Sequence, residues 1–452
     1  DSSSRSIINV ATGTITVNPI NDAPIVENID DQYMYIGKST NIEMTGTDIE
    51  GDNLTYSIVS SPSNSSVSIN NNLINFEPSN IGTFTITFKA NDGIDDSNIG
   101  QVNVEVQNTG YGLVFGGDEE EESFSIIETS NGEYVIGGNS NQNAHLLKIS
   151  SSGSKIWERT FESSRLENAF EIDETVDGGF VIAGYSKESN CCNHGLYLAK
   201  TDSNGNLEWS SVKDYGDGRN FSRSVQETVN GNFILTGWLW SNREDIHVLK
   251  TDSNGNEIWS KNIDLDSDQQ GYKIIETFDS GYAITGSNGR IVKLDSNGNE
   301  EWQGGFTGNG QSIKQTSDGG YILGISYGNG NDGYDIALLK MNQDGQEEWF
   351  KDLSSNGNEF AYDVVQANDN GYIIVGQTDK NGSEDMYIIK TDSNGNEEWS
   401  NTYGSSFNEI ATSISSTSDN YYVIAGFSQS FSSNNNKDIY VIKIDDQGNQ
   451  IF

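Results

Sequence analysis

A segment of about 50 residues recurs seven times between residue 111 and the end of the chain, and this repeat limits the possible folds more than any other feature. Its clearest copy is MYIIKTDSNGNEEW at residues 386–399. In every copy a lysine stands nine positions before the terminal aromatic residue, and a glycine stands four positions before it. The copies end, in chain order, at Trp157, Trp209, Trp259, Trp302, Trp349, Trp399 and Phe452. A repeat of this period predicts one supersecondary unit that is stacked or closed on itself.

Each copy predicts a β-hairpin. An apolar, β-branched run such as YIIK leads into D-S-N-G-N and then into a second strand that begins near the aromatic residue. The aspartate can cap the turn with its side chain, and the glycine takes the left-handed position of the loop. The motif is similar to the start of a calcium loop, but it lacks the later bidentate glutamate, so we interpret it as a turn.

A second hairpin precedes each of these, as in DVVQANDNGYIIVG from Asp363 and SIKQTSDGGYILGI from Ser312. Four strands in each of seven units predict a seven-bladed β-propeller. The last copy ends at Phe452, where its fourth strand should begin, whereas YGLVFGG at residues 111–117 aligns with a fourth strand. We therefore expect this N-terminal segment to supply the outer strand of the last blade and so to close the propeller.

Composition places a domain boundary near residues 108–110. All four prolines lie before residue 108, and all eight tryptophans lie after residue 150. Residues 19–108 contain short alternating strands and no helical period, which predicts an Ig-like β-sandwich. Residues 111–452 form the predicted propeller. Residues 1–18 are interpreted as the last strand of a preceding Ig-like domain in a longer array, or as a donor strand that completes a neighbouring molecule.

The formal charge of −42 excludes a surface that binds nucleic acid or inserts into an anionic membrane, because both need lysine and arginine. No apolar run is long enough to span a bilayer. The two cysteines, Cys191 and Cys192, are adjacent and cannot staple distant strands, so a strained vicinal disulfide or a reduced pair is expected. Such acidity suits an extracellular protein or one that binds calcium.

The N-terminal domain resembles a known family. NPINDAP, TDIEGDNLTYSI and KANDG are similar to motifs of the bacterial cadherin-like (dystroglycan-type) Ig-fold repeat, which occurs in tandem on surface proteins. The resemblance implies weak Ca²⁺ binding, although the exit linker VQNTG lacks the Asn-Asp pair that would complete the site. An Asx-rich turn without metal is the alternative. The implied ligands are Asn21, Asp22, Asp48, Glu50, Asp52 and Asp92.

The seven repeats resemble those of quinoprotein-type propellers, and more closely the repeats of bacterial and archaeal surface proteins. The repeats also serve as controls for one another, because a residue that recurs in every blade belongs to the scaffold. His145 and His247 occupy a column that holds tyrosine elsewhere, so we expect them to pack within strands. We also expect the lysine column to pair with a Glu/Gln column in the first strands, and the tryptophans to pack between blades.

Residues outside the repeat template are the candidates for function. WLWSNRED contains Trp238, Trp240, Asn242 and Arg243, in which exposed indoles beside polar groups could bind a sugar ring. An ordinary surface loop is the alternative. Acidic residues also gather in inter-blade loops, including Asp118 to Glu122.

No nucleophile elbow, HExxH motif or P-loop is present, so we predict no enzyme. A quinone-dependent dehydrogenase would need basic and aromatic residues on the propeller axis, and the sequence alone does not assemble them. We predict a secreted or cell-surface, non-catalytic adhesion or assembly module, in which an Ig-like spacer presents a propeller that binds a glycan, a surface protein or copies of itself. The alternatives are a polysaccharide-acting enzyme and a protomer of an extracellular filament joined by strand exchange.

Overall fold

The computed structural model describes residues 21–35, 40–62, 65–78, 82–107, 112–116, 119–163, 165–188, 194–215, 219–240, 243–264, 267–328, 333–355, 357–380, 382–405, 407–430 and 436–452. The predicted lone strand at residues 1–18 lies outside these ranges. The chain divides into two compact units, Asp1–Gln107 and Asn108–Phe452. The described residues contain strands, turns and one short 3₁₀ helix, η1 (Ser287–Gly289), so the predicted all-β class is confirmed. None of the described helices has the length and apolarity needed to cross a membrane.

The first unit is an Ig-like sandwich of two main sheets. Its sheets have the strand orders β2-β9-β8-β5 and β3-β7-β6, and β1 pairs with β4. Alternation along β8 sends Ile86, Phe88 and Ala90 into the core and threonines to the opposite side. The strands are β1 (Ile25–Val26), β2 (Gln32–Tyr35), β3 (Thr40–Glu43), β4 (Gly46–Thr47), β5 (Thr55–Ser60), β6 (Ser65–Asn70), β7 (Leu73–Pro78), β8 (Gly82–Asn91) and β9 (Gly100–Gln107).

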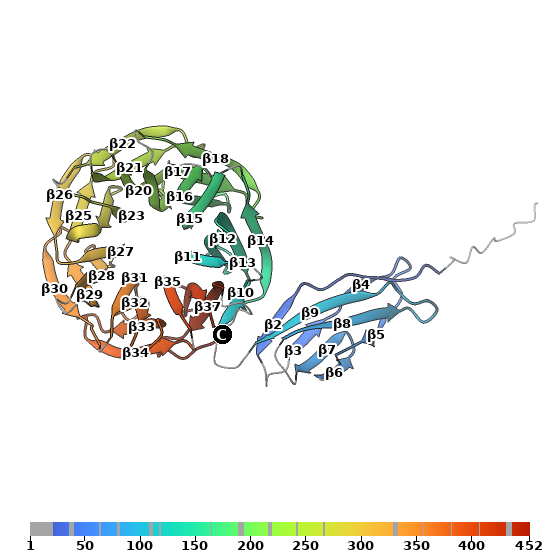
Figure 1. Cartoon of the computed structure of the whole chain (residues 1–452). Helices are drawn as coiled ribbons and strands as arrows, with labels where there is room; N and C mark the ends of the chain where they lie inside the picture. Colours follow the sequence, from blue (N-terminus) through green and yellow to red (C-terminus); the bar gives the residue numbers. More distant parts are fainter. Residues whose placement is uncertain are drawn as a thin grey trace, which may run out of the picture. The chain divides into compact units, whose positions relative to one another are not determined.

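The described part of the second unit forms seven four-stranded antiparallel sheets, which we call blades 1 to 7 in chain order (Figure 1). Blade 1 comprises β11 (Glu121–Glu128), β12 (Tyr134–Ser140), β13 (Asn143–Ile149) and β14 (Lys155–Phe161). Blade 2 comprises β15 (Arg165–Glu174), β16 (Phe180–Glu188), β17 (His194–Thr201) and β18 (Leu207–Lys213). Blade 3 comprises β19 (Asn220–Glu227), β20 (Phe233–Trp240), β21 (Glu244–Thr251) and β22 (Glu257–Ile263). Blades 4 and 5 comprise β23 (Gly271–Glu276), β24 (Tyr282–Gly286), β25 (Arg290–Leu294), β26 (Glu300–Gly305); β27 (Asn309–Gln315), β28 (Tyr321–Gly328), β29 (Tyr334–Met341) and β30 (Glu347–Asp352). Blades 6 and 7 comprise β31 (Glu359–Gln366), β32 (Tyr372–Thr378), β33 (Asp385–Thr391), β34 (Glu397–Tyr403); β35 (Glu409–Ser416), β36 (Tyr422–Ser428) and β37 (Asp438–Ile444), together with β10 (Leu113–Phe115).

Blade 7 takes its fourth strand from the beginning of the unit. Strand β10 pairs antiparallel with β37, with Val114 opposite Tyr440, as the alignment of residues 111–117 predicts. Side chains also join blade 1 to blade 7. The Glu128 carboxylate accepts a hydrogen bond of 2.7 Å from the backbone N–H of Ser418, and the Ser123 hydroxyl donates to the Gly426 carbonyl at 2.5 Å. The two ends of the repeat are therefore in direct contact.

The repeated tryptophan and glycine belong to one contact between neighbouring blades. The turn glycines have positive φ, such as +77° at Gly255, so the predicted left-handed loop is confirmed. A Cβ atom on Gly255 would lie 2.8 Å from the indole of Trp209, which belongs to the preceding blade. The same indole packs against Phe233 with ring centroids 6.2 Å apart. The glycine is thus required twice, by its backbone conformation and by the indole that covers it.

The predicted partner of the lysine column is wrong. Six of the seven buried repeat lysines bond to carboxylates within their own blade, and Lys390, for example, reaches Asp369 at 2.6 Å and Glu398 at 2.8 Å. The seventh, Lys250, donates to the Tyr282 hydroxyl of the next blade. The Glu/Gln column instead caps the turn of the preceding blade, as Glu227 does when it accepts the Val176 N–H at 2.6 Å. The backbone of that turn needs an acceptor, and the lysine already has nearer anions in its own sheet.

Substituting a covered turn glycine should cost more stability than substituting an open one. Gly231 has φ of +71°, and a Cβ atom on it would meet no other atom within 4 Å, so Gly231→Ala introduces backbone strain alone, about 1 kcal/mol. Gly255→Ala adds a clash with Trp209, and we expect a total of about 2–4 kcal/mol. Denaturant unfolding followed by tryptophan fluorescence measures this difference in the propeller, because all eight tryptophans lie in the second unit. Equal losses in the two variants would contradict the packing role of the indole.

Candidate functional site

A β-bulge interrupts the first strand of every blade. In each case the pairing with the second strand skips one residue, as between Ser222 and Ser224 in β19. A bulge leaves the extra residue unpaired and re-aims its side chain. We call the seven extra residues the bulge ring. Its members are Phe124, Phe170, Arg223, Tyr272, Gln311, Tyr362 and Thr412.

The residues that follow the bulges form a second ring, which we call the linker ring. Its members are Ser125, Glu171, Ser224, Lys273, Ser312, Asp363 and Ser413. The first strands lie on the inner side of the circle of blades (Figure 1), and the whole bulge ring lines one cavity with most of the linker ring. This axial cavity has a volume of about 210 Å³.

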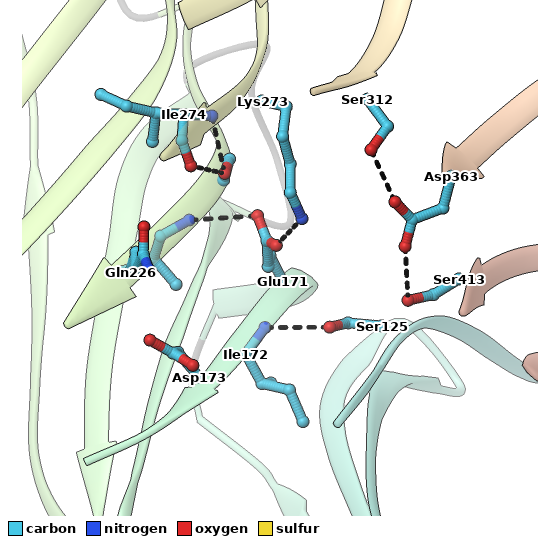
Figure 2. A network of polar contacts seen from close by, with 12 residues as sticks. Ser125, Glu171, Ile172, Asp173, Gln226, Lys273, Ile274, Ser312, Asp363 and Ser413 are labelled. Atoms are coloured by element: carbon cyan, nitrogen blue, oxygen red, sulfur yellow. Dashed lines mark hydrogen bonds and ion pairs between the residues drawn. The ribbon is translucent and has the colours of Figure 1, made fainter. Parts of the chain in front are cut away.

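The linker ring joins neighbouring blades by hydrogen bonds (Figure 2). A side-chain oxygen in one blade accepts the backbone N–H of the next blade, as Ser224 does from Ile274 at 3.1 Å. The series passes from blade 7 to blade 1, where the Ser413 hydroxyl accepts the Ile126 N–H at 3.2 Å. These side chains therefore have a structural role, and the lysine in blade 4 has no oxygen with which to follow the pattern.

The charged members of the linker ring are paired. Lys273 donates to Glu171, whose other oxygen accepts the Val225 N–H at 3.3 Å. Asp363 accepts hydrogen bonds from the Ser312 hydroxyl at 2.6 Å and from the Ile414 N–H at 3.1 Å. Burial acts to raise the pKa of Asp363, but the ammonium groups of Lys314 and Lys273 and these hydrogen bonds lower it overall. Asp363 is therefore held ionised.

Arg223 is the one charged residue of the bulge ring. Its guanidinium carbon lies 4.9 Å from the ring centroid of Phe170 and 5.4 Å from that of Tyr272. Within the part of the chain that the structure describes, this guanidinium donates no hydrogen bond and forms no ion pair. Burial lowers the pKa of Arg223, because removal from water disfavours the charged form of the guanidinium and no close anion compensates for it.

A second cavity, of about 280 Å³, lies further along the first strands. Glu171 and Lys273 line both cavities, so their ion pair stands between them. Asp173 lines the second cavity and accepts the Glu227 N–H at 2.8 Å. Burial, together with the neighbouring charge of Glu171, raises the pKa of Asp173 to about 7.

The tryptophan-rich segment differs from its prediction. Trp238 stays within β20 opposite Phe221, is only 9% exposed, and stacks on that ring at 4.7 Å, so its predicted exposure is wrong. Trp240 is half-buried with the guanidinium of Arg219 at 5.0 Å, and Arg243 pairs with Asp245 at 3.3 Å. Asn242, like Cys191 and Cys192, lies outside the described residues. A ligand-binding role for Trp240 and Arg243 stays a prediction.

The two template histidines are buried within strands, as expected. His145 and His247 are each 2% exposed. The His145 ring lies 3.0 Å from the Thr160 hydroxyl, and the His247 ring lies 2.7 Å from the Asn262 side chain. Burial lowers the pKa of His145 to about 4, so this imidazole is neutral at physiological pH.

The six residues implied as calcium ligands come together on three loops of the Ig-like unit. Asn21 donates to Asp92 at 2.9 Å, the Asp22 N–H approaches Glu50 at 3.4 Å, and Asp48 accepts the Asp52 N–H at 3.0 Å. The second carboxylate oxygen of Asp48 is buried without a hydrogen bond. Among the residues described, no three His, Cys, Asp or Glu side chains are arranged to hold a metal ion. Calcium binding therefore stays a prediction.

The axial cavity is the site that sequence reasoning missed. The bulge residues directly precede the repeat segments such as SVQETVNG, and their column varies from blade to blade, whereas the column two positions later holds only Ile or Val. That variation was visible in the sequence. The cavity also brings basic and aromatic side chains together on the axis, which the sequence alone did not allow us to do.

Comparisons with known proteins agree with the two-part organisation. Residues 21–105 match the family model described as a bacterial Ig domain, and residues 242–442 match the model described as the outer membrane protein assembly factor BamB. These matches confirm the expected resemblance of an Ig-like domain followed by a quinoprotein-like propeller. No curated protein matches the chain significantly.

Three solved structures illustrate the similarity. BamB from Moraxella catarrhalis is 10% identical, with 92% of this chain and 99% of that chain covered and a TM-score of 0.42. A quinoprotein alcohol dehydrogenase-like protein from Bacteroides thetaiotaomicron is 11% identical, with 85% and 97% covered and a TM-score of 0.43. A protein of unknown function from Bacteroides caccae is 12% identical, with 62% and 97% covered and a TM-score of 0.44.

The raised pKa of Asp173 predicts a loss of stability at alkaline pH. The folded protein holds the Asp173 proton up to about pH 7, whereas the unfolded chain releases it near 3.8, so stability falls as pH rises through this interval. Asp173→Asn keeps an acceptor for the Glu227 N–H and removes the charge. We expect this variant to gain on the order of 2 kcal/mol over the wild type at pH 8 and little at pH 4.

The measurement is denaturant unfolding of both proteins at each pH, followed by tryptophan fluorescence. Only the difference between the two proteins is compared, because His145 makes its own contribution between pH 4 and 6.5. Burial acts to raise the pKa values of Asp177 and Asp279, but hydrogen bonds from threonine and lysine lower them to about 2, so both stay ionised throughout. A pH-independent difference would show that Asp173 titrates normally.

Proposed function

We propose that this chain is a non-catalytic binding module of a secreted or cell-surface protein, which acts in adhesion or in extracellular assembly. The propeller holds its ligand in the axial cavity, and the Ig-like domain serves as a spacer. The observation that carries this proposal is which polar groups of the cavity are already bonded to the protein and which are not. The acids are engaged in structural contacts, while the aromatic rings and Arg223 remain available to a ligand.

Catalysis by acids and bases requires a group that can exchange a proton in reach of the substrate. Asp363 is bonded by Ser312, Ser413 and backbone N–H groups, and its pKa is lowered by the neighbouring lysines despite its burial. Glu171 is bonded to Lys273. Both carboxylates therefore serve to hold blades together.

Recognition needs only shape and complementary contacts. The cavity offers the aromatic faces of Phe124, Phe170 and Tyr272 beside amide and hydroxyl groups. Such linings are typical of sites that bind small polar molecules. The matches to a bacterial Ig domain and to an outer membrane assembly factor support a role at the cell surface or in assembly.

The proposal is tested by applying the full chain to a panel of immobilised neutral and acidic glycans and then analysing the released material. We expect retention of at least one glycan class, competition by its soluble fragments, and no shortening of the glycan after prolonged incubation. Because the proposed site is axial, binding should persist when the surface residue Arg243 is replaced, as in Arg243→Ala.

Two results would overturn this function. Shorter oligosaccharides among the products would identify a polysaccharide-acting enzyme. Absence of any glycan binding, together with self-association of the full chain, would favour the filament protomer joined by strand exchange.

Calcium binding to the Ig-like unit is a separate proposal. We expect millimolar Ca²⁺ to raise the melting temperature of this unit, with an affinity of about 10⁻⁴ to 10⁻³ M, because Asp48 and Asp92 would supply carboxylate oxygens. Calorimetry records both units, whereas tryptophan fluorescence follows the propeller alone, so the shift should appear only in the first signal.

The double variant Asp48→Asn, Asp92→Asn should abolish the calcium shift. Glu77→Gln is the matched control, since this exposed acid lies on β7 away from the three loops. A shift that survives in the double variant, or that is lost in the control, would show that calcium acts elsewhere.

A further inference from the structure

Arg223 stands out against the other buried cations of the propeller. Six of the seven repeat lysines reach a carboxylate, at distances such as 2.6 Å for Lys148 to Glu133 and 2.7 Å for Lys443 to Asp419. The seventh, Lys250, donates to the Tyr282 hydroxyl at 2.7 Å. In a chain of net charge −42, anions are abundant. The half-buried Arg223 guanidinium, which contacts aromatic rings and forms no ion pair, therefore differs from the repeat lysines.

Leaving that guanidinium without a counter-ion costs stability. An unpaired charge removed from water is unfavourable, and cation–π contacts offset only part of this cost. The Glu171 carboxylate that could have paired with Arg223 is bonded to Lys273 instead. Arg223 lines the cavity, so its N–H donors remain available to a ligand.

The bulge ring has two chemically different arcs. Blades 1 to 4 contribute aromatic rings and Arg223, whereas blades 5 to 7 contribute Gln311, Tyr362 and Thr412. A ligand that satisfies both arcs needs an anion, an apolar face and several hydroxyl groups. The volume of about 210 Å³ limits the enclosed part to about one ring.

We propose that the axial cavity binds a uronic acid residue at the end of an acidic polysaccharide. Arg223 binds its carboxylate through a bidentate pair, which suits the planar guanidinium. The C–H face of the sugar packs on the aromatic rings that line the cavity. Its hydroxyl groups bond to the Gln311 amide and donate to the Thr412 oxygen, whose own hydrogen is given to a backbone carbonyl. An aspartate or glutamate side chain of a protein would supply the anion alone and leave the Gln311 amide without a partner.

This inference rests on the proposed binding function and adds the chemical class of the ligand. The test uses the full chain, with binding measured by ligand-detected NMR and calorimetry. The main probes are D-glucuronate, D-galacturonate, D-glucuronamide and D-glucose, and the comparison probes are acetate, an acidic peptide, a sulfated sugar and a uronate polysaccharide. We expect at least one of the two acids to bind at least tenfold more tightly than the neutral amide, which has the same shape without the charge.

Substitutions of Arg223 test whether this residue binds the carboxylate of the sugar acid. Arg223→Met should reduce the affinity for the acid at least tenfold, and the melting temperature should stay the same or rise because a desolvated charge is lost. Arg223→Lys should retain part of the affinity, since it keeps the charge without the fork. Arg159→Gln is the matched control, because Arg159 also lies on an aromatic ring, 5.5 Å from that of Trp157, but belongs to the outer strand β14.

Gln311→Leu separates sugar recognition from anion binding. It should weaken binding of the acid sugar and leave binding of acetate unchanged, because acetate has no hydroxyl group for Gln311. An equal loss of affinity for the acid sugar and for acetate would show that the Gln311 amide contacts the carboxylate, and it would contradict the two-arc assignment.

Several outcomes would overturn the inference. Binding of uronate that is indifferent to Arg223→Met would place the ligand elsewhere. Binding of an acidic peptide in preference to the sugar acids would assign the cavity to a protein carboxylate, and preference for a sulfated sugar would assign it to sulfate. If neutral glycans bind and no sugar acid binds, the proposed binding function is supported and the proposed uronate site is wrong. Turnover of the probe polysaccharide would remove both.

Discussion

The propeller depends on side chains that accept backbone N–H groups across the gap between blades. Each blade is a complete four-stranded sheet, and no strand pairing connects one described blade to the next. Neighbouring blades pack through the repeat tryptophans, and hydrogen bonds between them come from the linker ring near the axis and from the Glu/Gln column at the turns. Examples are Ser224 to Ile274 and Glu227 to Val176. Where serine replaces that column in blade 7, the Tyr422 hydroxyl accepts the Asn368 N–H at 3.3 Å instead. The requirement is thus for an acceptor, and several residue types meet it.

This constraint separates scaffold from free positions along the same strand. Five of the seven linker-ring residues accept an N–H of the next blade, and these five are serine or acid. The preceding residue, in the bulge ring, is left out of the strand pairing and does not have to accept a backbone N–H. Phe, Arg, Tyr, Gln and Thr therefore all occur there without disturbing the fold. The seven bulge-ring residues, which differ in chemical type, therefore lie together in the lining of the axial cavity.

The sequence predicted what recurs and failed where the fold changes the register. The hairpins, the left-handed glycines and the blade-to-blade tryptophans follow from spacing, since each depends on a local turn. The lysine partners were misassigned because column order does not reveal which acid lies nearest in space. Trp238 is predicted to be exposed because it falls outside the template, but β20 extends far enough to pair it with Phe221. The bulges add one residue to the first strands and carry no turn signal, so the ring that contains Arg223 could not be derived, although its variability was visible.

The large negative charge of the chain bears on how an acidic ligand reaches this cavity. A net charge of −42 repels a polyanion at long range, whereas the Arg223 contact acts at short range within a partly desolvated space. Salt screens exposed charges beyond about 8 Å at physiological ionic strength and affects buried pairs much less. Added salt therefore weakens the repulsion more than the contact.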